Sequence, residues 1–143
     1  MSVTAPSAVK AALKTLLEAD NDLSGVTVYT SPESADTLDR EHVVLGNVKG
    51  RNEPFAMGYT FLSTYDIECT AMFHKPAKSD TVDRAWVLLQ NVSDIVAGNW
   101  TVSGNTLDAE VTDWEYDEMP HPDGKGWQTT VGFTIAIKDL GTV

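Results

Sequence analysis

The sequence predicts an α+β fold in which a mainly antiparallel sheet carries two helices packed on one face. Two segments have apolar residues at helical spacing, five others resemble strands, and the order is α-β-β-β-α-β-β. Two helices are too few to cover both faces of a sheet this wide, and hairpin-like connections favour antiparallel pairing. The length of 143 residues suits a single domain over 1–143.

The first third of the chain predicts a helix and two strands. The helix begins at Pro6, because a proline in the first helical turn sacrifices no hydrogen bond, and its apolar residues follow at helical spacing: Val9, Ala12, Leu13, Leu16 and Leu17. β-branched residues predict strands over 26–30 and 42–48. The polar segment 31–41 between them is expected to be a loop. Two glycines and a proline indicate a long connecting loop over 49–58.

A long strand is expected over 59–73, where apolar and polar residues alternate. Its 15 residues far exceed the usual length of about 5–6. The strand therefore either bends, with Leu62-Ser63 as the candidate position, or reaches past its own domain to a neighbour.

The last part of the chain predicts a helix over 80–96 and two closing strands. Ser79 or Asp80 is placed to cap the helix, Gly98 ends it, and its apolar positions are Val82, Ala85, Trp86, Leu89, Val92 and Val96. In the strand over 107–118 the alternation slips by one residue, which predicts a β-bulge near Thr112-Asp113. A hairpin loop over 119–126 then leads into the strand over 127–137.

Composition excludes several classes of protein. With 21 acidic and 10 basic residues the net charge is −11, so binding to phosphate backbones through Lys and Arg is not expected. The chain has one cysteine, and its first ten residues lack a long apolar stretch, so we expect synthesis in a reducing cytoplasm. The sequence has no run of about 18 apolar residues, so we expect no membrane-spanning helix.

The sequence contains none of the common catalytic or phosphate-binding motifs, and we expect neither enzymatic activity nor a cofactor. His121 and Asp123 sit in the hairpin loop, where a polar turn explains them better than a metal site. Cys69, with His74 nearby, is a candidate thiol nucleophile, but its place on the apolar side of the long strand predicts an inert, buried group.

The segment 107–118 is strongly acidic and contains no Lys or Arg. One interpretation is a solvated strand whose charges protect a sheet edge against aggregation. The other is a surface that repels polyanions and, repeated around a ring, lines a channel. The candidate residues for such a lumen or ring surface are Asp108, Glu110, Asp113, Glu115 and Asp117.

The expected loop over 49–58 combines charged residues with large apolar ones. Aromatic residues and methionine are enriched at protein interfaces, although Phe55 folding back over the sheet is an equal alternative. The candidate residues for a subunit or tube interface are Arg51, Asn52, Glu53, Phe55 and Met57.

In the order, length and residue character of these elements, the chain resembles the tail terminator proteins of long-tailed bacteriophages. This family includes the tail-to-head joining proteins and the minor tail protein U type. The resemblance covers the opening helix over 8–18, the strand pair, the segments 49–58 and 59–73, the helix over 80–96 and the closing strands.

The resemblance implies a non-enzymatic virion protein of the tail or neck, assembled in the host cytoplasm. Such proteins form a homo-hexameric ring on the head-proximal end of the tail tube and terminate its polymerisation. Their partners are the major tail tube protein and the head-tail connector or stopper protein, and DNA passes through the ring without specific binding.

Three alternatives remain at this point. The first is another neck or tail completion protein, such as a head-closure stopper or a tube subunit, although tube subunits usually have a single helix. The second is a small hydrolase that uses Asp113 and Glu115, since paired carboxylates carry out glycoside hydrolysis. The third is a monomeric adaptor anchored by Phe55 and Met57.

Overall fold

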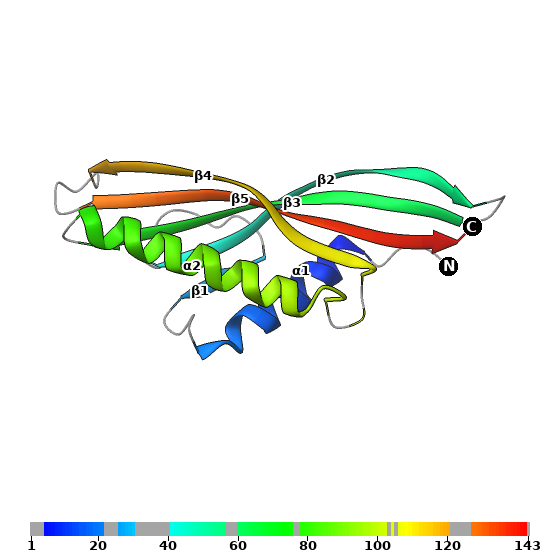
Figure 1. Cartoon of the computed structure of the whole chain (residues 1–143), viewed down its shortest axis with the longest axis horizontal. Helices are drawn as coiled ribbons and strands as arrows, with labels where there is room; N and C mark the ends of the chain where they lie inside the picture. Colours follow the sequence, from blue (N-terminus) through cyan, green and yellow to red (C-terminus); the bar gives the residue numbers. More distant parts are fainter. Residues whose placement is uncertain are drawn as a thin grey trace.

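The computed structural model describes residues 5–21, 26–30, 41–56, 60–75, 78–102, 104, 106–120 and 127–142. Two helices lie on one face of a twisted sheet (Figure 1). The elements are α1 (Pro6–Glu18), β1 (Thr27–Tyr29), β2 (His42–Ala56), β3 (Thr60–Lys75), α2 (Lys78–Gly98), β4 (Asp108–Pro120) and β5 (Trp127–Thr142). The α-β-β-β-α-β-β order expected from the sequence is confirmed.

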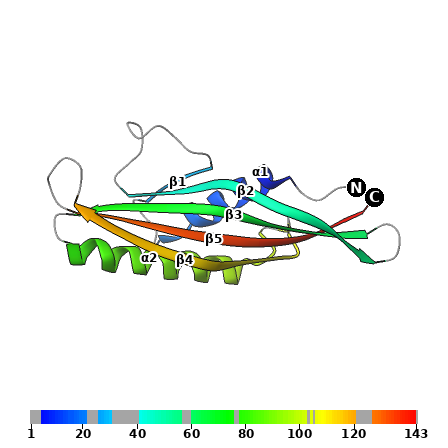
Figure 2. The same cartoon turned by 90° about the horizontal axis from the view of Figure 1, so that it is seen from above.

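The sheet has five strands in the order β1-β2-β3-β5-β4. The three pairings from β2 to β4 are antiparallel, and the short β1 lies parallel to β2. Strand β1 pairs only with His42–Val44, at one end of β2 (Figure 2). The rest of β2 and the whole of β4 therefore form the two edges of the sheet as far as the described strands extend.

The core lies between the sheet and the helices. Helix α1 contributes Val9, Leu13 and Leu17, and α2 contributes residues from Ala85 to Val96. On β3 and β5 the odd-numbered residues point inward, and Ile67, Phe73 and Ile135 are fully buried. Each such side chain stabilises the fold by roughly 1.5–3 kcal/mol, so the strict alternation of these two strands fixes which face of the sheet is covered.

The segment expected to be a loop, 49–58, is largely strand, and that prediction was wrong. Strand β2 continues to Ala56 and pairs with β3 throughout. Gly50 lies opposite Tyr65, where an added Cβ would collide with the Tyr65 Cβ and lie 2.5 Å from the Thr64 carbonyl oxygen. Pro54 is tolerated because β2 is an edge strand. Gly50 thus marks a place where the β3 backbone comes close, and Pro54 marks an edge strand. Neither residue indicates a loop here.

Strand β3 pairs with β5 from Thr60 to Lys75 without a register shift, so its pairing is not interrupted at Leu62-Ser63. Strands β2, β3 and β5 instead extend beyond both helices (Figure 1). The great length of β3 therefore comes from a projection past the helical layer.

The bulge expected near Thr112-Asp113 is confirmed by a register shift between Val111 and Trp114. Because a bulge inserts an extra residue, it reverses which parity faces each side of the sheet. The even-numbered Asp108 and Glu110 before it therefore point to the same face as the odd-numbered Glu115 and Asp117 after it.

We expect Gly50→Ala to lower the free energy of unfolding by about 1–3 kcal/mol, because the backbone of β3 leaves no room for a side chain. Gly132→Ala is the matched control, since nothing lies within 4 Å of a Cβ at Gly132 on β5. Denaturant unfolding of both variants measures the difference. Equal stability of the two variants would contradict the close approach.

Candidate interaction surface

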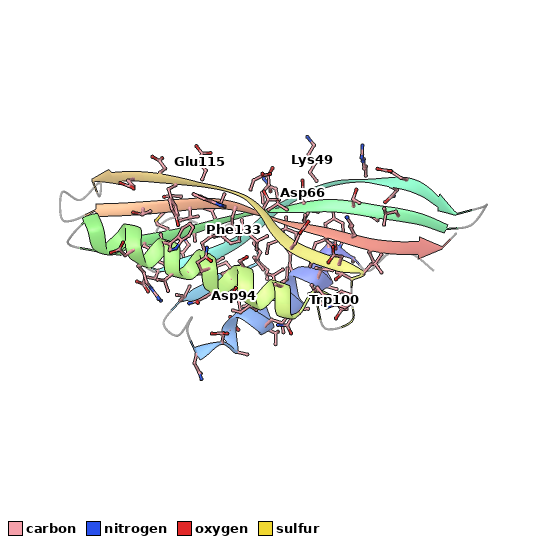
Figure 3. All side chains as sticks on the ribbon, viewed as in Figure 1. Lys49, Asp66, Asp94, Trp100, Glu115 and Phe133 are labelled. Carbon is pink, nitrogen blue, oxygen red and sulfur yellow. The ribbon has the colours of Figure 1, made fainter. Side chains whose placement is uncertain are left out.

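The face of the sheet opposite the helices, called the open face below, carries most of the residues singled out from the sequence. Lys49 and Glu115 point away from the helices, whereas Phe133 lies between the sheet and α2 (Figure 3). No described helix or strand covers the open face (Figure 1). This surface is therefore available to solvent or to a partner.

Strand β4 supplies a row of carboxylates to the open face. Glu115 lies opposite Gly132 and Asp117 opposite Thr130, while Asp108 and Glu110 lie opposite Lys138 and Ala136, all residues of β5. Asp113 occupies the bulge and is exposed. The register thus brings four of the five predicted acidic residues to one side of β4, and Asp113 lines a hollow on that side together with Glu115 and Glu68.

Two further carboxylates, Asp66 and Glu68 of β3, belong to the same face. Sequence alternation places them on the solvated side of their strand but does not show that they are near β4. Only β5 separates β3 from β4, and its open-face residues there include the small Gly132 and Ala136. The acidic surface therefore extends across β3, β5 and β4. The sequence alone could not show this, because it does not give the order of the strands in the sheet.

Two open hollows mark this surface. One, of about 310 Å³, is lined by Glu68, Asp113 and Glu115 together with residues of β5. The other, of about 580 Å³, is lined by Asp66, Glu68 and the cationic residues Lys49, Arg51 and Lys138. Carboxylates around the first hollow are exposed and share one environment, unlike an acid and base held in separate environments.

Positive charge gathers on the open face at the β2 edge. Lys49 and Arg51 both lie there, and Arg51 forms an ion pair with Glu53, with 2.7 Å between Nε and Oε1. Asn52 is exposed and faces the helix side of the sheet, opposite Ser63. Of the apolar interface candidates, Phe55 belongs to β2 with its side chain outside the described part, and Met57 lies outside the described residues.

The register shows how these charges are arranged across the sheet. One row starts at Lys49 on β2 and passes through Asp66 on β3. It continues to Ala136 on β5 and ends at Glu110 on β4. The next row starts at Arg51 and ends at Asp108. Each row is basic at the β2 edge and acidic at the β4 edge.

An aromatic cluster lies on the helix side of the β4 edge. The ring centroids of Trp86 and Trp114 are 5.6 Å apart, and those of Trp114 and Tyr116 are 5.2 Å apart. Trp86 is 44% exposed and Trp114 is 51% exposed, so Trp86 is not the core position expected from helical spacing. Burial raises the pKa of the Tyr116 hydroxyl. The cluster leaves large apolar surface beside an open sheet edge.

Cys69 lies in the core, as expected, and its thiol donates a weak hydrogen bond to the Ile67 carbonyl oxygen at 3.4 Å. Burial raises the pKa of this thiol to about 12, against a weaker opposite effect of Lys10. The side chain of His74 lies outside the described part of the chain. A thiol in this environment is a poor nucleophile.

Other predicted features concern metals and membranes. His121 and Asp123 lie outside the described residues, and the described part of the chain contains no group of three or more potential metal ligands. None of its helices is long and apolar enough to cross a membrane.

Comparison with known proteins gives a match by fold only. No family model and no curated protein sequence matches the chain. A chain from a solved structure described as the virion of a native gene transfer agent (GTA) particle is similar, with a TM-score of 0.59 and 17% identity. The match covers 90% of this chain and 93% of the other. The two chains therefore share a fold over nearly their whole lengths.

We expect Cys69 to resist a thiol-specific reagent at pH 8 in the folded protein. A shift of the pKa from 9.0 to about 12 lowers the thiolate fraction roughly a thousandfold, and burial blocks access as well. Absorbance with a chromogenic disulfide reagent measures the reaction, and the guanidine-unfolded chain provides the control that reacts fully. Rapid labelling of the native protein would reopen a role for the thiol.

Proposed function

We propose that this chain is a tail terminator of a phage-like virion. It forms a hexameric ring on the head-proximal end of the tail tube, terminates tube polymerisation and joins the tail to the head connector. Two findings support the proposal: the fold shared with a chain of a GTA virion, and the resemblance of the element order to tail terminators. The proposed site of action is the tail or neck, after assembly in the host cytoplasm.

The observation that carries the proposal is the acidic open face. A ring that surrounds DNA must let a polyanion pass without binding it, and negative charge on the channel wall repels phosphate. In the proposed ring the open face lines the channel and the two helices lie outside. The carboxylates of β3 and β4 then face the DNA.

The proposed partners follow from this position. The chain contacts further copies of itself, the major tail tube protein on one side and the connector or stopper protein on the other. In this proposal its role is structural and needs no catalytic residue or cofactor. The exposed carboxylates around Asp113 serve as channel charge and do not form a hydrolytic pair.

A second candidate is another completion protein of the neck, such as a head-closure stopper. The same fold likeness supports it, because a shared fold with a virion chain does not distinguish between positions in the virion. The two candidates differ in which partner the chain binds first.

Tube polymerisation distinguishes these functions. We expect purified chain, added to polymerising tail tube protein, to shorten the tubes and to form a ring at one end of each, as seen by negative-stain electron microscopy. Tubes grown without the chain set the reference length.

Tubes of unchanged length with bare ends would contradict the terminator function. Binding to the isolated connector in the absence of tubes would instead favour the stopper, and incorporation along the tube wall would indicate a tube subunit.

A further inference from the structure

Each end of the sheet presents a long strand edge. From Leu45 onwards β2 has no described strand on its outer side, and β4 has none from Asp108 to Pro120. Unpaired backbone N–H and C=O groups along such edges are templates for pairing with another chain.

Charge decides between the possible pairings. From Asp108 to Asp117, the open-face residues of β4 that pair with β5 are all acidic, so two β4 edges placed together would bring carboxylates opposite one another. The outer part of β2 instead presents Lys49 and Arg51 on the same face, with Glu53 beside them in an ion pair with Arg51. Opposite charges on neighbouring strands stabilise pairing and like charges oppose it. Charge therefore favours β2 over a second β4 as the partner of the β4 edge.

Strand direction is compatible with this pairing. Three successive antiparallel pairings separate β2 from β4, so the two edge strands run in opposite directions within one chain. Rotation about an axis roughly along the strands preserves those directions, so β2 of one copy meets β4 of the next antiparallel. The open faces of both copies then lie on the same side of the continued sheet, which brings the opposite charges together.

The rows across the sheet show what meets at such a joint. If the sheet continues level, Lys49 of one copy faces Glu110 of the next, and Arg51 faces Asp108. If the strands are staggered toward the β4–β5 hairpin, the same cations meet Glu115 and Asp117. Both registers are electrostatically favourable, because β4 is acidic on the open face on either side of its bulge.

Apolar surface on the helix side supports the same contact. Trp86 and Trp114 are about half exposed beside the β4 edge, and Val48 lies on the helix side of β2 next to its outer edge. A strand added to β4 would cover part of the two indole rings. Burial of large exposed aromatic side chains is typical of the centre of a protein interface.

We propose that a second copy of this chain pairs with the β4 edge through the outer part of its β2, residues 45–56, so that one sheet continues from copy to copy. The two edges differ, so the contact is head-to-tail and repeats until the rotation closes a ring. This inference rests on the ring of the proposed function and specifies the contact that builds it.

Charge exchange between the edges tests the contact. We expect Lys49→Glu/Arg51→Glu to weaken self-association about tenfold or more, because each attractive pair becomes repulsive. The acids of β4 are reversed in two separate variants, Asp108→Lys/Glu110→Lys and Glu115→Lys/Asp117→Lys. Self-association should weaken by a similar factor in the variant whose acids face β2 in the assembled register. Sedimentation velocity over a concentration series measures the association.

A mixture of two charge-reversed variants gives the most direct test. An equimolar mixture of the β2 variant with the matching β4 variant should form rings again, because alternating copies restore an attractive pair at every joint. The control Lys10→Glu/Lys14→Glu changes the net charge equally but places both substitutions on α1, away from the two edge strands, and it should associate like the wild type. Circular dichroism of each variant establishes that it is folded.

The proposal is overturned if both β4 variants associate normally, if no mixture of folded variants associates, or if the wild type stays monomeric at millimolar concentration. These outcomes are separable from failure of the proposed function. Rings that respond to charge exchange but do not end tail tubes would remove the terminator function and leave the contact. Tubes that are capped by a chain insensitive to charge exchange would do the reverse.

Discussion

The unbroken antiparallel pairing of β3 with β5 is the interaction on which the rest of the structure depends. Every residue from Thr60 to Lys75 has a partner on β5, without a single register shift. On one side of this pair the odd-numbered residues form the centre of the core beneath both helices. On the other side, the same alternation places Asp66 and Glu68 on the open face. A slip of one residue would exchange the two faces, so the core and the acidic surface are fixed together.

Patterns confined to one element were predictable from the sequence. Pro6 marked the start of α1, and the slip in alternation at Thr112-Asp113 located the bulge that keeps the acids of β4 on one face. Features that depend on a partner strand were not. Residues 49–56 form a strand because they pair with β3. The sequence did not indicate this, because glycine and proline are usually found in loops. Helical spacing likewise could not show that Trp86 lies beside the edge strand β4, half exposed against Trp114. The acidic face as a whole required the order of the strands.

Segregation of charge gives the two sheet edges different properties. An edge strand with charged side chains resists uncontrolled pairing, and β4 carries acids on its open face from Asp108 to Asp117. This protects a free copy from pairing with the same edge of another. The cations of β2 provide an exception for one specific partner strand. In a closed ring the carboxylates of β4 that do not face these cations, together with Asp66 and Glu68, would repel the DNA in the channel.

A cryo-electron microscopy reconstruction of the assembled oligomer, at a resolution that separates strands, tests the central claim most directly. We expect β2 of one copy to lie about 4.8 Å from β4 of the next, with the open faces lining the channel and both helices outside. A channel lined by helices, or two β4 strands meeting at a twofold contact, would contradict both the orientation of the acidic face and the head-to-tail joint.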